Sequence, residues 1–177
     1  MATPAIAFTQ IANDCEAEGL TQHNVERIAA ELAKTFSVHS DEVATLKLEK
    51  TNLRFVYPAK LGNVGSIPVN TTTSVAARTA STKRAEAINN FAQTKHASIF
   101  EAVDISGKQH VAGQKEDKSA HNIQKLMTVP VVSLNGVLGV VQISRKGKSA
   151  PEAGADFTPA DLQRLVAITT ALAKCFK

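Results

Sequence analysis

The sequence predicts an α+β fold in which a central antiparallel sheet of about six strands carries the terminal helices on one face. Three observations lead to this prediction. Apolar residues have helical spacing near both ends of the chain, they alternate with polar residues over residues 44–57, and two β-rich apolar runs flank Asn135-Gly136. The chain of 177 residues has the usual length of a single domain.

Two helices are expected before the first strand. Over residues 8–15 the apolar positions have helical spacing, and Gly19 supplies a C-terminal stop. Thr21 can cap a second, longer helix. The apolar stripe of this second helix consists of Val25, Ile28, Ala29, Leu32 and Phe36. We therefore interpret residues 1–20 as an N-terminal helical extension and residues 21–177 as the domain proper.

The middle of the chain predicts a strand pair followed by less regular structure. Residues 44–48 and 53–57 alternate between apolar and polar side chains, which favours two antiparallel strands, and Pro58 ends the second. The Gly-, Asn-, Pro- and Thr-rich residues 59–73 predict a long loop, and a helix is expected within residues 71–82.

Three further segments have mixed signals. Residues 86–91 are compatible with a short strand or with an extended loop. Residues 95–103 suggest one or two helical turns, and residues 106–121 suggest an exposed loop.

The two apolar runs around Asn135-Gly136 predict a hairpin. A type I′ turn is expected at this dipeptide, because such a turn needs positive φ at both central residues. Both runs are apolar on successive residues, so both faces of these strands are expected to be covered and the strands to be central in the sheet.

The start of the last helix is well marked. Thr158 is an N-cap, Pro159 fits the first helical position, and Asp161 favours the positive end of the helix. The helix is expected to end near Phe176. Its inner side consists of Leu162, Leu165, Ile168 and Leu172.

Composition excludes several classes of protein. The chain is 44% hydrophobic and 20% charged, and its longest apolar runs are too short to span a bilayer. The net charge of +4 comes from scattered lysines and arginines without stacking aromatic residues, so no nucleic-acid partner is expected. The N-terminus lacks the basic region of a signal peptide, which favours a cytoplasmic location.

No motif for catalysis or metal binding is found. Cys15 and Cys175 have neither metal-binding nor redox spacing, and we favour two buried or half-buried thiols on the terminal helices over a disulfide. The five histidines are not paired at helical spacing, so no metal or haem site is expected. Phosphate-binding and hydrolase motifs are missing as well.

Residues 21–176 resemble a GAF domain, the small-molecule sensor module of cyclic-nucleotide phosphodiesterases, phytochromes and many bacterial regulators. Three stretches carry the resemblance. "SVAARTASTKRAEAIN" is similar to the family's small-residue helix and following strand, and "LMTVPVVSLNGVLGVVQIS" to its core hairpin. "RKGKSAPEAGADFTPAD" is similar to its signature of Asn-Lys, a spacer, Phe and Asp.

The third stretch implies a structural motif. By the resemblance, Lys146 pairs with Asp161 across the spacer and Phe157 is the signature phenylalanine, while Arg145 stands where the family has asparagine. The alternative is an N-cap aspartate with a solvated lysine nearby.

The resemblance also implies a ligand pocket on the sheet face opposite the terminal helices, roofed by short helices and loops. Arg78 is expected to meet an anionic ligand or to reach solvent. Gln142 is expected either to contact the ligand or to bond internally, and core packing is the alternative for the phenylalanines and the methionine. The candidate ligand-binding residues are Ser74, Arg78, Asn89, Phe91, Phe100, Met127 and Gln142.

The expected function is a non-catalytic sensor domain that binds a small molecule and signals through a partner or a dimer. Free methionine sulfoxide reductases resemble GAF domains but use pocket cysteines, whereas both cysteines here are expected on the terminal helices. The alternative is an interaction or dimerisation module with a vestigial pocket. A homodimer through the terminal helices is expected, because the apolar stripe of residues 8–15 would otherwise have to fold back on its own helices. The sequence predicts neither the ligand nor a cofactor.

Overall fold

The computed structural model describes residues 4–63, 65–71, 74–91 and 122–177. Among these residues six strands form one sheet in the order β3-β2-β1-β6-β5-β4, and every neighbouring pair is antiparallel. The strands are β1 (Val43–Glu49), β2 (Asn52–Tyr57), β3 (Ser66–Pro68), β4 (Glu86–Ile88), β5 (Ile123–Ser133) and β6 (Gly136–Lys146). The predicted α+β class and the sheet of about six strands are confirmed.

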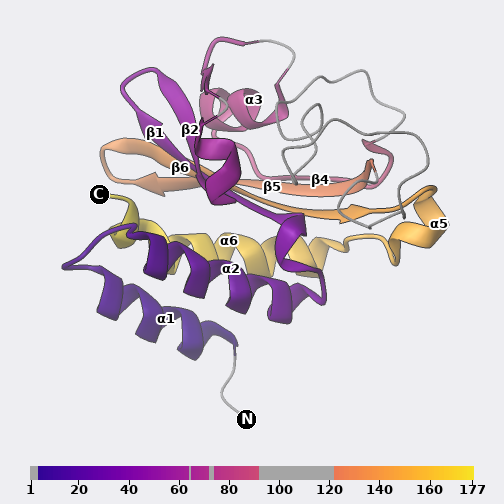
Figure 1. The fold of residues 1–177 in the computed structure, drawn as a ribbon, viewed down its shortest axis with the longest axis horizontal. Helices are drawn as coiled ribbons and strands as arrows, with labels where there is room; N and C mark the ends of the chain where they lie inside the picture. The colour runs from indigo at the N-terminus through magenta and orange to yellow at the C-terminus, as the bar shows by residue number, and fades with distance from the viewer. Residues whose placement is uncertain (1–3, 64, 72–73, 92–121) are drawn as a thin grey trace.

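Helices cover both faces of this sheet (Figure 1). The terminal helices α1 (Pro4–Cys15), α2 (Gln22–Phe36) and α6 (Pro159–Leu172) lie on one face, and α3 (Val75–Thr82) lies on the other. No helix of the described part of the chain is long and apolar enough to cross a membrane. The remaining short elements are η1 (Ser40–Glu42), η2 (Ala59–Asn63), α5 (Ala150–Ala153) and η5 (Ala173–Phe176).

Successive residues of the central strands point into two separate cores. On β5, Leu126 belongs to the cluster under α3, whereas Met127 belongs to the cluster under the terminal helices. On β6, Val140 and Val141 divide in the same way. The prediction that both strands of this hairpin are covered on both faces is confirmed, because side chains of a strand alternate between its faces.

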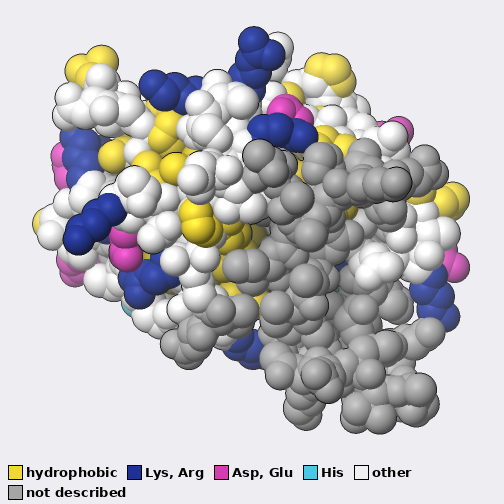
Figure 2. Space-filling view, turned by 90° about the horizontal axis from the view of Figure 1, so that it is seen from above, with side chains coloured by type: hydrophobic (Ala, Val, Ile, Leu, Met, Phe, Trp, Pro, Cys, Tyr) yellow, Lys and Arg dark blue, Asp and Glu magenta, His cyan; other side chains and the backbone are white. Residues whose placement is uncertain are grey.

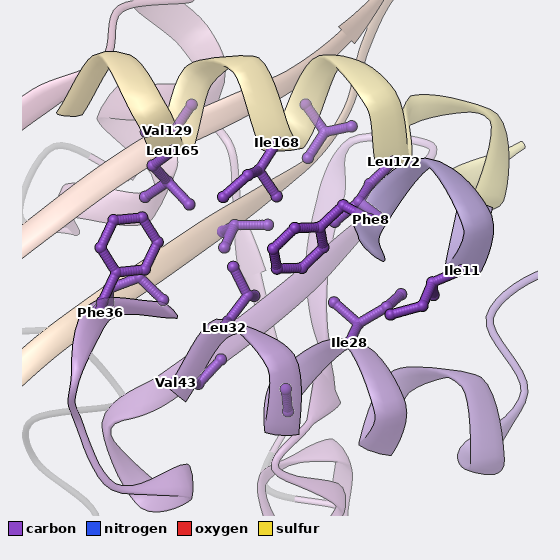
Figure 3. Packing of buried hydrophobic residues seen from close by; sticks show 14 of the residues in the cluster. Phe8, Ile11, Ile28, Leu32, Phe36, Val43, Val129, Leu165, Ile168 and Leu172 are labelled. Carbon is purple, nitrogen blue, oxygen red and sulfur yellow. The ribbon is translucent and has the colours of Figure 1, made fainter. Parts of the chain in front are cut away.

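The N-terminal helix α1 is part of the core under the terminal helices. Phe8 is fully buried, and it points between Ile168 of α6 and Leu32 of α2 (Figure 3). The apolar stripe that we expected to need a second copy of the chain therefore folds back on its own helices. The N-terminal helix of residues 1–20 thus shares one core with the helices of residues 21–177.

The helix starts agree with the sequence. The Thr21 hydroxyl accepts a hydrogen bond from the Asn24 amide at the start of α2. At the start of α6, the Thr158 hydroxyl accepts from the Asp161 amide and the Asp161 carboxylate accepts from the Thr158 amide, at 3.1 and 2.9 Å. This reciprocal capping box satisfies two donors that the first turn leaves free.

The hairpin turn lies one residue earlier than expected. Ser133 pairs with Gly136, so Leu134 and Asn135 form the turn. Only Gly136 of these residues has positive φ, at 128°, and the type I′ prediction is wrong. The Ser133 hydroxyl accepts a hydrogen bond from the Asn135 amide at 3.2 Å, which favours the earlier turn. A register shift between Val131 and Val132 accompanies it.

The segment predicted as a long loop contains η2 and the edge strand β3. Ile67 of β3 is buried opposite Leu53 of β2, and Pro68 is tolerated there because an edge strand can lose an amide donor. Of the mixed segments, residues 86–88 form the short strand β4. The expectations for residues 95–103 and 106–121 lie outside the described residues.

The buried position of Phe8 gives a testable prediction. Phe8→Ala should lower the free energy of unfolding by about 3–5 kcal/mol, because it removes a ring from a filled interior. The matched control is Gln10→Ala, an exposed position on the same helix, which should change it by less than about 0.5 kcal/mol. Urea unfolding followed by circular dichroism measures both. Equal effects of the two substitutions would contradict the packing of α1 described above.

Candidate functional site

A ladder of three buried polar side chains lies on the α3 face of the sheet. Thr79 of α3, Thr128 of β5 and Gln142 of β6 are each no more than 2% exposed. The hydroxyls of Thr79 and Thr128 are 2.8 Å apart, and the Gln142 side-chain amide donates to the Thr128 hydroxyl at 3.2 Å. Since Thr128 and Gln142 are directly paired in the sheet, the strand register itself creates this contact.

Helix α3 is positioned over the ladder by its cap and its small residues. The Ser74 hydroxyl accepts from the Ala77 amide at 3.2 Å, which fixes the start of the helix. Thr79 also donates its hydroxyl proton to the carbonyl of Val75 at 2.8 Å, so its hydroxyl oxygen accepts the proton from Thr128. Small residues let the helix approach the sheet closely; they are Ala76, Ala77 and Ala80.

Arg78 lies at the edge of the same face in an ion pair. Its guanidinium Nη2 is 2.7 Å from the Glu86 carboxylate on β4, and the two side chains are 35% and 31% exposed. The Nε donor of Arg78 is buried and has no hydrogen-bond partner among the residues that the structure describes. Within the described chain the guanidinium therefore meets Glu86, while contact of Arg78 with an anionic ligand stays a prediction.

The surroundings of the ladder are apolar. Phe91 is 1% exposed, which agrees with its core-packing alternative. Other buried members of this cluster include Ala44, Leu46, Leu126 and Val140. Figure 2 views the molecule from this side, and on the described part of it the lysines and arginines are scattered between patches of hydrophobic side chains. On this described part the basic side chains form no continuous track.

Asn89, one of the candidate ligand contacts, is used to hold the crossover between β6 and α6. Its side-chain amide donates to the Phe157 carbonyl at 3.0 Å, and its side-chain oxygen accepts from the Phe157 amide at 2.8 Å. Both ends of the Asn89 side chain thus bond the backbone of one residue, which lies 68 positions along the chain.

Two basic side chains hold the same crossover. Arg145 lies over the Phe157 ring, 4.5 Å from its centroid, and donates to the carbonyls of Ala155 and Phe36. The Lys125 ammonium, almost completely buried, is 2.8 Å from the Asp156 carboxylate. Arg145, which stands where the family signature has asparagine, therefore has a structural role of its own, because it holds the crossover.

Lys146 and Asp161, the pair expected from the family signature, each contact residues other than one another. Asp161 caps α6 through Thr158, which is the alternative left open by the sequence. The Lys146 ammonium donates to the Asp41 carbonyl at 3.3 Å, and the Lys146 amide donates to the Glu42 carboxylate at 2.7 Å. Lys146 is only 2% exposed, so the expectation of a solvated lysine is wrong.

Of the two other candidates, Met127 needs correction, and Phe100 is not among the described residues. Met127 points toward the terminal helices, because it lies next to Leu126 on a strand whose side chains alternate, so it does not line the α3 face. Phe100 lies outside the described residues. Thr79, Thr128 and Glu86 were not among the sequence candidates, although alternation from Gln142 in the correct register would have indicated Thr128.

Both cysteines lie in the core under the terminal helices, on the opposite face from the ladder. Burial raises the pKa of the Cys175 thiol to about 12, and burial also raises the pKa of Cys15. Within the described ranges no group of three histidines, cysteines or carboxylates could hold a metal ion.

Solved structures that share this fold include GAF domains. The GAF domain of an Acinetobacter phosphoenolpyruvate-protein phosphotransferase is 12% identical, with a TM-score of 0.65, and the match covers 99% of this chain and 94% of that one. The GAF domain of a two-component sensor histidine kinase from Bacillus halodurans is 19% identical, with a TM-score of 0.56 and coverage of 85% and 92%. The predicted GAF-like fold is thereby confirmed.

An enzyme has the same fold. The fRMsr of Staphylococcus aureus in complex with substrate is 18% identical to this chain, with a TM-score of 0.57, and the match covers 100% of this chain and 97% of that one. No protein-family model and no curated protein matches the sequence. The comparisons therefore establish the fold, which is found both in signalling proteins and in an enzyme.

The double hydrogen bond of Asn89 predicts the effect of its removal. Asn89→Ala should lower the free energy of unfolding by about 1–3 kcal/mol, because the amide and carbonyl of Phe157 lose their partner inside the protein. Asn90→Ala is the matched control, since Asn90 is the exposed neighbour, and it should cost less than about 0.5 kcal/mol. Denaturant titration compares the two; a cost for Asn90→Ala as large as that for Asn89→Ala would show that the crossover is not held in this way.

Proposed function

We propose that this chain is a non-catalytic sensor domain that binds a small molecule on the sheet face covered by α3. The observation that supports this most directly is the buried ladder of Thr79, Thr128 and Gln142 within an apolar layer. A few fixed polar groups in apolar surroundings are typical of small-molecule sites. The opposite face is filled by three packed helices, which leaves the α3 face for a ligand.

The proposed ligand contacts are Ser74, Arg78, Phe91 and Gln142. The Ser74 hydroxyl accepts one hydrogen bond and still has a proton to donate. The Nε of Arg78 is a buried donor that lacks a partner in the described structure, so an acceptor group on the ligand would satisfy it. Phe91 supplies an apolar surface in the cluster that also contains Val75, Ala76 and Ala77 of α3.

The ligand signal would pass to a separate partner or to a second copy of the chain, in the cytoplasm. The fold supports this, because the solved structures that share it include a domain of a sensor histidine kinase. For the dimer we propose an interface on the outer surface of the terminal helices, where Val166 of α6 is 39% exposed. Light scattering tests this interface, because a chain that stays monomeric at high concentration does not form such a dimer.

A second function is favoured by one observation. Thr79, Thr128 and Gln142 bond one another, as expected for an interior that needs no ligand. The chain would then be an interaction or dimerisation module with a vestigial pocket.

A thermal-shift screen of nucleotides, amino acids and aromatic acids separates the two functions. A ligand present at 100 times its Kd should stabilise the protein by about 2.7 kcal/mol. Gln142→Met should abolish the shift, whereas Met127→Leu, on the next strand but facing the terminal helices, should preserve it. Loss of the shift in Met127→Leu alone would place the ligand elsewhere, and no shift with any compound would favour the interaction module.

The positions of the cysteines predict the outcome of an enzyme assay. Cys15 and Cys175 are the only cysteines of the sequence, and both lie across the sheet from the proposed ligand site. Purified protein supplied with a thiol reductant should therefore not reduce free methionine sulfoxide. The Staphylococcus fRMsr, assayed in parallel, is the active control. Turnover that is retained after repeated purification would contradict a non-catalytic function.

A further inference from the structure

The two cysteines, 160 positions apart in the sequence, meet in the folded chain. Cys15 is the last residue of α1, and Cys175 belongs to the C-terminal turn η5. Both are completely buried in the same cluster, and each thiol lies near enough to the other to affect its pKa. The Cys175 sulfur also lies 3.8 Å from the Ala12 carbonyl of the last turn of α1.

Polar contacts on the surface hold the same two segments together. The Lys174 ammonium is hydrogen-bonded to the Asn13 side chain and lies 3.6 Å from the Glu16 carboxylate. Residues on both sides of Cys15 are thus joined to the residue before Cys175. The approach of the two thiols therefore belongs to a packed junction between the ends of the chain.

We propose that Cys15 and Cys175 form an oxidisable dithiol, which a small-molecule disulfide converts into a covalent link between α1 and the C-terminal segment. The link would join the first helix to the last turn of the chain, on the face opposite the proposed ligand site. It is therefore independent of whether a ligand binds under α3.

The reaction is a thiol–disulfide exchange in two steps. The Cys15 thiolate attacks one sulfur of the small disulfide, and one small thiol leaves. The Cys175 thiolate then attacks the Cys15 sulfur, the protein disulfide forms, and the second small thiol leaves. Two protein thiols lose their protons and two electrons, and the small disulfide is reduced to two thiols.

Cys15 is the first nucleophile for two reasons. Burial raises the pKa of both thiols; the neighbouring Cys175 thiol acts against this rise at Cys15, whereas Cys15 adds to it at Cys175. In addition, Phe176 anchors η5 against β6, so the opening is assigned to α1. A Cβ atom at Gly139 of β6 would lie 2.9 Å from the Phe176 ring, which shows how closely this ring contacts the strand.

Access to the thiols depends on the opening of α1. Both cysteines are fully buried, so a dissolved disulfide reaches them only when the helix separates from the core. Native protein should consequently react with an aromatic disulfide reagent at least roughly tenfold more slowly than protein unfolded in guanidinium chloride. Once formed, the link closes a loop of nearly the whole chain, which restricts the unfolded state and opposes further opening of α1.

The test uses the full chain in buffers with increasing ratios of oxidised to reduced glutathione. After the remaining thiols are blocked with N-ethylmaleimide, intact mass and peptide mapping identify the products. We expect a monomeric product that has lost two hydrogens, carries the Cys15–Cys175 link and returns to the dithiol with dithiothreitol. Its melting temperature should exceed that of the reduced protein.

The matched variants are Cys15→Ala and Cys175→Ala. Each should take up no more than one glutathione, form no internal link and show no rise in melting temperature on oxidation. Glutathione adducts that persist on both cysteines of the wild-type chain, links only between molecules, or an oxidised form that melts earlier would each overturn the proposal. Because the wild-type comparison needs no variant, a variant that fails to fold does not remove the test.

Discussion

The structure depends on one constraint: the central strands β5 and β6 are apolar on both faces, so both faces of the sheet must be covered. Leu126 and Met127, adjacent on β5, lie in different cores. The terminal helices supply one cover and α3 the other (Figure 1). Since burial of apolar surface is the main favourable contribution to folding, the chain can leave neither side open. The packing of α1 follows, because Phe8 fills the space between α2 and α6.

The two covers differ in their chemistry. The core under the terminal helices contains the two thiols, whereas the layer under α3 contains the hydroxyl and amide groups of Thr79, Thr128 and Gln142. A polar ladder of this kind specifies the position of α3, because each partner would otherwise be buried without a hydrogen bond. The irregular crossover between β6 and α6 is fixed by Asn89, whose side chain hydrogen-bonds the backbone amide and carbonyl of Phe157. The position of α3 and the anchoring of the crossover are thus fixed by different residues.

Much of the fold could be predicted from periodicity and capping residues, including α2, the β5-β6 hairpin and the start of α6. The site was harder, because it depends on register. A turn centred on Asn135-Gly136 would pair Thr128 with Ile143, whereas the observed turn and the register shift between Val131 and Val132 together pair it with Gln142. An error of one residue exchanges the faces of a strand, which also explains why Met127 was placed on the wrong side. Strands as short as β3 have too few residues for any periodicity to appear.

The central claim is that the α3 face is the ligand-binding face and the opposite face is filled. Methyl NMR tests it most directly, because Val140 and Val141 are neighbours on β6 that point to opposite faces, as do Leu126 and Met127 on β5. When a compound that stabilises the protein is titrated, the methyl signals of Leu126 and Val140 should shift with its concentration, while those of Met127 and Val141 should stay unchanged. Shifts confined to Met127 and Val141 would contradict this account.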